Sequence, residues 1–151
     1  MGRITELLTA AQQRAQELKL PYVGALLPQE AWELLRIAPG TTLIDVRSRA
    51  EIDFNGAPVG AVHVEWQSWP GWVANPHFLP QLRQAVDPEA LLLFLCRSGL
   101  RSHKAATLAT EAGLAACYNV LEGFEGDLDK GTGHRNELNG WKKRGLPWTQ
   151  N

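Results

Sequence analysis

A cysteine followed by a short loop of arginine, serine and glycine is the part of this sequence best suited to chemistry. The loop covers residues 96–102 and reads Cys-Arg-Ser-Gly-Leu-Arg-Ser. It follows the apolar run 91–95 and precedes a helical pattern expected from about 101 to 112. The cysteine therefore lies between a buried strand and a helix N-terminus, where backbone N–H groups and the helix dipole stabilise an anion. The pattern predicts a thiolate nucleophile held in an anion cradle.

The charges around this cysteine favour attack on sulfur. Arg97 and Arg101 add positive charge beside Cys96, and no acid or histidine adjoins the cysteine in the sequence. A thiolate that attacks a polarised sulfur atom has no proton to lose, and a good leaving group such as sulfite can depart unprotonated. No two His, Cys or acidic residues have convincing metal spacing, so we expect neither a metal nor another cofactor.

Length and composition predict one cytoplasmic domain. The chain has 151 residues, of which 44% are hydrophobic, and this is enough to build a core without disulfides or metal. A net charge of −1 gives no general attraction to nucleic acid or to a membrane. Two cysteines are too few for a disulfide framework and favour a reducing compartment. We see no secretory signal and no apolar run near the roughly 20 residues that span a bilayer.

Alternating strands and helices are expected to position the loop. Apolar runs predict strands at 22–26, 42–46, 61–64, 91–95 and 118–121. Helical periodicity and start signals predict helices at 5–19, after Pro28, after Ser48, near 79–86 and at about 101–112. The run 91–95 does not alternate, so both faces of this strand should be covered. We therefore predict an α/β fold with a central five-stranded, largely parallel sheet flanked by helices on both faces, and a ligand at the carboxyl ends of its strands.

Four segments resemble the single-domain rhodanese sulfurtransferases. Besides the loop at 96–102, Leu-Ile-Asp-Val-Arg-Ser at 43–48 with Glu51 resembles the family's Asp-Val-Arg segment. The stretch 56–63 resembles the part that follows it, and Leu-Glu-Gly-Phe at 121–124 resembles the family's closing strand and glycine turn. The resemblance implies a rhodanese-like domain over residues 21–151, preceded by an N-terminal helical extension over residues 1–20.

The resemblance also implies a mechanism. A persulfide would form on Cys96 from a small donor such as thiosulfate and pass to cyanide, a thiol or an acceptor protein. Backbone amides of 97–101 would hold the terminal sulfur, Arg97 would bind the anionic donor and Arg101 would close the loop. Asp45 and Arg47 would order neighbouring loops. The residues implied to surround the substrate are Arg97, Ser98, Gly99, Leu100, Arg101 and Ser102.

Two other functions stay open. A cysteine phosphatase or an arsenate reductase would share the fold, but these enzymes commonly need a roomier Cys-x5-Arg cradle. Here four residues separate Cys96 from Arg101, so the loop is one residue short. A non-catalytic binding module is the third possibility, and the intact loop argues against it.

We interpret several other residues near the predicted site as structural. Cys117 is expected to be a small core residue, and His63 and His103 are expected to be hydrogen-bonded structural histidines. Residues 66–80 predict an ordered aromatic loop whose three tryptophans pack in the core or on the surface more readily than they wall a pocket; these are Trp66, Trp69 and Trp72. Further on, 123–140 predicts an irregular loop and 141–144 one last turn of helix.

Overall fold

A five-stranded parallel sheet forms the centre of the computed structural model, which describes residues 2–150. The sheet order is β1–β8–β7–β2–β4, and every neighbouring pair is parallel. The strands are β1 (Gly24–Leu26), β2 (Thr42–Asp45), β4 (Val62–His63), β7 (Leu92–Leu95) and β8 (Cys117–Val120). The predicted five-stranded parallel sheet is therefore confirmed.

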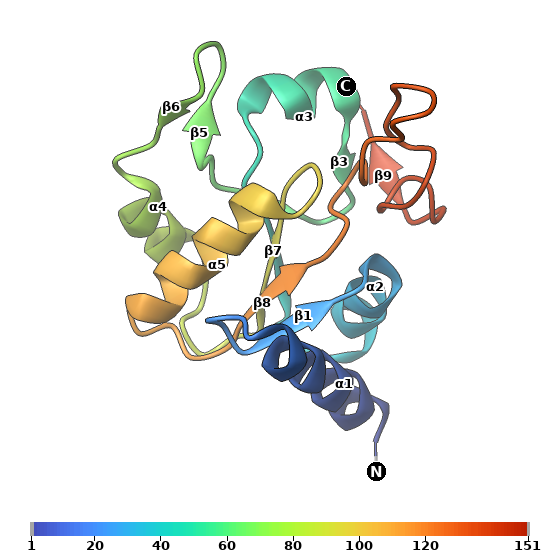
Figure 1. Cartoon of the computed structure of the whole chain (residues 1–151). Helices are drawn as coiled ribbons and strands as arrows, with labels where there is room; N and C mark the ends of the chain where they lie inside the picture. Colours follow the sequence, from blue (N-terminus) through green and yellow to red (C-terminus); the bar gives the residue numbers. More distant parts are fainter. Residues whose placement is uncertain (1, 151) are drawn as a thin grey trace.

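Helices cover both faces of this sheet (Figure 1). They are α1 (Arg3–Leu18), α2 (Pro28–Ile37), α3 (Arg49–Asn55), α4 (Phe78–Ala85) and α5 (Leu100–Glu111). Along β7, Leu92 and Phe94 pack in the cluster that contains α4 and α5, while Leu93 and Leu95 pack in the cluster that contains α1 and α2. Because side chains of a strand alternate between faces, an unbroken apolar run is the pattern of a strand buried on both sides.

The first helix packs on the domain. Leu7 and Ala11 of α1 are buried in the same cluster as the side chains of α2. Arg14 of α1 forms an ion pair with Glu30 of α2, with 2.9 Å between Nη1 and Oε1. The N-terminal helix predicted at 5–19 is confirmed, while the division of the chain at residue 20 stays a prediction.

A local sequence signal sets the start of α3. Ser48 precedes α3 and its Oγ accepts the N–H of Glu51, while the Glu51 carboxylate accepts the N–H of Ser48. This reciprocal capping box satisfies two backbone donors that a helix N-terminus leaves open. The predicted start of the helix after Ser48 is confirmed.

Three short features differ from the expectation. The aromatic segment forms a hairpin of β5 (Gln67–Ser68) and β6 (Val73–Ala74), and β3 (Ala57–Pro58) pairs with β9 (Trp148–Thr149) near the C-terminus. Residues 141–144 form a hydrogen-bonded turn and not a helix. Two-residue strands carry too little periodicity to be recognised from sequence, because only their long-range pairing defines them. Within residues 2–150, no helix is long and apolar enough to cross a membrane.

Candidate active site

The loop after β7 wraps around the sulfur of Cys96. The N–H of Gly99 donates to Cys96 Sγ at 3.1 Å, and the hydroxyl of Ser102 donates to the same atom at 3.3 Å. Gly99 has φ +112°, a conformation that residues with a Cβ rarely adopt, and it stands directly before α5. The left-handed glycine turns its own N–H back toward the sulfur. Several backbone amides of the loop were expected to face inward. The structure shows a hydrogen bond to Sγ from one of them, the N–H of Gly99.

The thiol is more enclosed than the sequence suggests. Cys96 is 1% exposed because its side chain lies on the face of the sheet covered by α5, and Ser102 of that helix is fully buried against it. Ser98 is half-buried and Leu100 is exposed. The sulfur therefore sits at the boundary between the core and the loop, with polar hydrogens directed at it.

The order of the sheet explains how the loop is held. Strand β7 lies between β8 and β2, so the segments that follow these two strands flank the loop on either side. Because parallel strands end at one edge of a sheet, three segments distant in sequence converge there. One flank is the turn after β8, and the other is the segment that leads from β2 into α3.

The turn after β8 fixes the backbone of the loop. The N–H of Phe124 donates to the carbonyl of Cys96 at 2.8 Å, and the N–H of Glu125 donates to the carbonyl of Arg97 at 3.0 Å. Gly123 makes this approach possible, since a Cβ there would lie 2.5 Å from the carbonyl carbon of Arg97. Gly123 also has φ +65°, so any larger residue would be strained as well as crowded.

On the other flank, Glu51 of α3 holds Arg101. Arg101 donates from Nη1 and Nη2 to the two carboxylate oxygens of Glu51 at 2.6 and 2.9 Å. Burial alone would raise the pKa of Glu51, but the hydrogen bonds and charge of Arg101, together with those of Ser48, lower this pKa to about 2. Burial by itself would lower the pKa of Arg101. The hydrogen bonds and charge of Glu51 outweigh the effect of burial, so this pKa is raised. The pair is therefore ionised and joins the loop to α3.

Asp45 and Arg47 form a second pair deeper in the molecule. Arg47 is fully buried, Asp45 is 1% exposed, and Nη2 of Arg47 lies 2.6 Å from Oδ2 of Asp45. Arg47 also donates to the carbonyl of Gly56 at 2.8 Å, and its Cζ lies 4.2 Å from the ring centroid of Phe124. These contacts join the loop after α3 to the turn that holds the Cys96 backbone.

Behind the loop runs a chain of side-chain hydrogen bonds. The side-chain amide of Asn119 donates to the carbonyl of Gly99 at 3.2 Å and to the hydroxyl of Tyr22 at 3.3 Å. The Tyr22 hydroxyl lies 2.8 Å from Nδ1 of His103, and burial raises the pKa of Tyr22. The chain supports the glycine whose N–H faces the sulfur.

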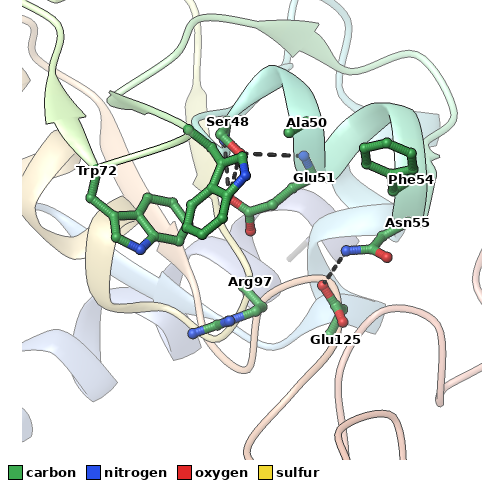
Figure 2. A pocket seen from close by; sticks show the side chains of 9 residues that line it. Ser48, Ala50, Glu51, Phe54, Asn55, Trp72, Arg97 and Glu125 are labelled. Atoms are coloured by element: carbon green, nitrogen blue, oxygen red, sulfur yellow. Dashed lines mark hydrogen bonds between the residues drawn. The ribbon is translucent and has the colours of Figure 1, made fainter.

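A hollow of about 270 Å³ opens beside the loop. Figure 2 shows Trp72 and Arg97 at one end of it and Phe54 and Asn55 at the other. The Nε of Arg97 is buried and has no hydrogen-bond partner within the described part of the chain. The lining residues are Ser48, Ala50, Glu51, Phe54, Asn55, Trp69, Trp72, Arg97 and Glu125.

The structure corrects the expectation for two of the three tryptophans. Trp66 is partly buried and packs edge-on against the core residue Phe78, as expected. Trp69 and Trp72 instead line the hollow, because the β5–β6 hairpin carries them away from the core and toward α3. The signal in the sequence was the position of Trp69 and Trp72 on either side of Pro70 and Gly71, two residues that favour a turn.

The other residues of interest behave as structural groups. Cys117 is a fully buried core residue, and burial raises the pKa of its thiol. His63 bonds the carbonyl of Arg47 at 2.7 Å. The sequence analysis named Glu51 only within the segment that resembles the family's Asp-Val-Arg stretch, so it missed the bonds from Arg101 to Glu51 and from Asn119 to the loop. In residues 2–150, no three His, Cys, Asp or Glu side chains form a group that could hold a metal ion.

Comparisons with known proteins point to one family. A model described as a rhodanese-like domain matches residues 27–130. The crystal structure of Rv0390 from M. tuberculosis is 44% identical, with a TM-score of 0.78 over 86% of this chain and 99% of that one. The homodimeric polysulfide-sulfur transferase of Wolinella succinogenes is 26% identical, with a TM-score of 0.59 over 98% of this chain and 88% of that one. The thiosulfate sulfurtransferase GlpE of Haemophilus influenzae is 29% identical over 101 residues, which cover 67% of this chain and 84% of that protein.

Proposed function

We propose that this chain, which belongs to the rhodanese-like domain family, is a sulfurtransferase that carries sulfane sulfur as a persulfide on Cys96. The observation that carries the proposal is the N–H of Gly99 directed at Cys96 Sγ at 3.1 Å. An N–H donor so placed stabilises a thiolate and, after a small shift, the outer sulfur of a persulfide anion. The hydroxyl of Ser102 adds a second donor at 3.3 Å.

The reaction consists of two displacements at sulfur. The Cys96 thiolate attacks the outer sulfur of thiosulfate, the S–S bond of the donor breaks, and sulfite leaves with the electron pair. The enzyme then holds a persulfide anion with one negative charge. A cyanide ion or a thiolate attacks the terminal sulfur of this persulfide, and the Cys96 thiolate is released. Neither displacement needs a proton from the protein, which fits a site without a dedicated general base.

The loop supports this chemistry through charge and enclosure. Arg97 lines the hollow and its Nε has no partner in the described chain, so its positive charge can attract an anionic donor. Cys96 is 1% exposed, and a small donor reaches such a thiol more easily than a bulky reactive group does. The low local dielectric strengthens the interaction between the sulfur and the donors that face it.

Phosphoryl or arsenate chemistry is the weaker alternative. Those reactions use the loop arginine to bind the oxyanion, whereas both terminal nitrogens of Arg101 are bonded to Glu51 here. A shorter loop with an engaged arginine suits one sulfur atom better than a tetrahedral oxyanion. The small donor, the cyanide or thiol acceptor, an acceptor protein and a reducing, cytoplasmic setting remain predictions.

Intact mass spectrometry after incubation with thiosulfate tests the proposal. We expect a gain of one sulfur atom on Cys96 that cyanide removes as thiocyanate. Cys96→Ser should lose both the adduct and the turnover, and Cys117→Ala is the matched control that should keep both. Equal thiocyanate formation by the wild-type protein and Cys96→Ser would refute sulfur transfer through Cys96. Hydrolysis of an aryl phosphate without any sulfur adduct would support the phosphatase alternative.

A further inference from the structure

The hydrogen-bond chain behind the loop has a direction, which Asn119 sets at one end. The side chain of Asn119 is buried, and its Nδ2 lies 3.2 Å from the carbonyl oxygen of Gly99 and 3.3 Å from the hydroxyl oxygen of Tyr22. A carbonyl oxygen can only accept, so the group that faces Gly99 must be the NH2 of the carboxamide. The Tyr22 oxygen therefore accepts its hydrogen bond from Asn119.

At the other end, the proton of the Tyr22 hydroxyl needs an acceptor. Tyr22 is buried, and burial raises its pKa, so the hydroxyl keeps its proton. Within residues 2–150 this hydroxyl has two polar partners, Nδ2 of Asn119 and Nδ1 of His103, the second at 2.8 Å. Because Asn119 already donates, the Tyr22 proton goes to Nδ1, and a ring nitrogen accepts only when it carries no proton.

A proton on Nδ1 of His103 would reverse this order. The imidazolium would donate to the Tyr22 oxygen, and the Tyr22 proton would be left in a buried place without an acceptor. The Oδ1 of Asn119 is buried and has no hydrogen-bond partner in the described part of the chain. A half-turn of the carboxamide offers this oxygen to Tyr22, but it also turns the oxygen toward the carbonyl of Gly99. Only one of the two arrangements supports the loop.

The surroundings of His103 leave its ring free to change its charge. His103 lies on α5 and is partly exposed, so it can exchange protons with solvent. Tyr22 is the titratable group against its ring, edge-on with 5.2 Å between centroids. On α5 itself, the adjacent Lys104 is exposed and Arg101 is bound to Glu51. Histidine is the side chain whose charge ordinarily changes between about pH 5 and 8.

We propose that His103 is a positioning residue that acts on the Cys96 loop as a hydrogen-bond acceptor. Its unprotonated Nδ1 takes the Tyr22 proton and thereby keeps the NH2 of Asn119 on the carbonyl of Gly99. The N–H of Gly99 then stays directed at Cys96 Sγ. Protonation of His103 withdraws this support. The role rests on the proposed function, because the alignment of Gly99 matters only if the Cys96 thiolate reacts.

Two substitutions of His103 test the acceptor role. His103→Leu removes the acceptor, whereas His103→Asn keeps an oxygen near the place of Nδ1 and cannot be protonated. At about pH 8, above the ordinary titration range of histidine, we expect His103→Leu to lower kcat for thiocyanate formation. The decrease should be about 3- to 10-fold, the effect of one neutral hydrogen bond. His103→Asn should restore most of the loss, and His77→Leu, which removes an exposed histidine, is the control that should leave kcat unchanged.

The pH profile separates the acceptor role from simple packing. Titration of the Cys96 thiol lowers the rate of every variant in acid, so the comparison of interest is between wild type and His103→Asn. We expect the wild-type protein to lose about 3- to 10-fold more rate than His103→Asn as histidine becomes protonated. Parallel profiles for the two proteins, or equal kcat in His103→Leu and the wild-type protein, would overturn the inference.

Nitrogen NMR of the full chain with Cys96→Ser tests the relay without any sulfur chemistry. At neutral pH we expect Nδ1 of His103 to be unprotonated, and we expect the amide resonance of Gly99 to shift in step with the titration of His103. Tyr22→Phe should abolish this coupling. A proton on Nδ1 at neutral pH, or a Gly99 resonance that ignores His103, would contradict the relay. Intact coupling in a protein whose Cys96 forms no sulfur adduct would instead refute the proposed sulfur transfer.

Discussion

Two arginine–carboxylate pairs near the Cys96 loop have similar geometry and different consequences. Asp45 and Arg47 are two residues apart and almost fully buried, whereas Glu51 and Arg101 are 50 residues apart and partly exposed. The first pair braces the backbone around the site from within the core. The second joins the loop itself to a neighbouring helix. A bidentate pair can therefore serve mainly stability or mainly the geometry of a site, depending on what it connects and how deeply it is buried.

Breaking the buried pair should have the largest effect on stability. Arg47→Met leaves the Asp45 carboxylate buried without its cation, and such a loss costs about 3–5 kcal/mol. We expect the free energy of unfolding, measured by urea denaturation, to fall by this amount. The double variant Asp45→Asn with Arg47→Met removes both charges and should recover part of the loss. A decrease below about 1 kcal/mol for Arg47→Met would show that this pair is not a main support of the fold.

Breaking the second pair should affect turnover more than folding. Glu51→Gln removes the charge that holds Arg101 and leaves that guanidinium partly buried without its ion pair. We expect a loss of about 1–3 kcal/mol in the free energy of unfolding. A displaced loop should lower kcat for thiocyanate formation by up to about 100-fold. The control is Glu33→Gln, which removes a partly exposed partner of Arg3 and should leave kcat unchanged. Unaltered kcat in Glu51→Gln would mean that the pair does not position the loop.

The pH dependence of stability sharpens the comparison further. The pKa of Glu51 is about 2 in the folded protein against an ordinary 4.5, so its ionised form is favoured by folding. Its stabilising contribution is fully present above pH 4.5 and disappears as the pH falls toward 2. The difference in unfolding free energy between the wild-type protein and Glu51→Gln should therefore shrink steadily in urea titrations below pH 4.5. A difference that stays constant down to pH 3 would contradict this account of the ion pair.

The hydrogen bonds of Asn119 behind the loop should give the smallest effect. Asn119→Leu removes two hydrogen bonds, to the carbonyl of Gly99 and to the hydroxyl of Tyr22. A neutral hydrogen bond contributes about 1 kcal/mol, so we expect a modest loss of stability. We also expect kcat to fall about tenfold, because the Gly99 amide loses its alignment with the sulfur. Tyr22→Phe, which keeps the ring and the Asn119–Gly99 bond, should retain more activity. Equal kcat values for Asn119→Leu and the wild-type protein would show that Gly99 is held without this chain.

The sequence alone could reveal features that are encoded by residues close to one another in the chain. The capping box of Ser48 and Glu51 lies within one helical turn, and the unbroken apolar run before Cys96 indicated a central strand. The resemblance of residues 96–102 to the loop of a known family extended the prediction from these local elements to the whole fold. The sequence cue for the roles of Trp69 and Trp72 was weak, because a hairpin of two-residue strands has no periodicity to read.

The sequence by itself determined which residues form the loop, which strand precedes it and which helix follows it, since periodicity and capping act over a few residues. Only the tertiary structure decided what surrounds Cys96. Because β7 lies between β8 and β2, Asn119 and Gly123 reach the loop from one side and Glu51 from the other. Strand order brings these groups together across tens of residues, and no local pattern records it.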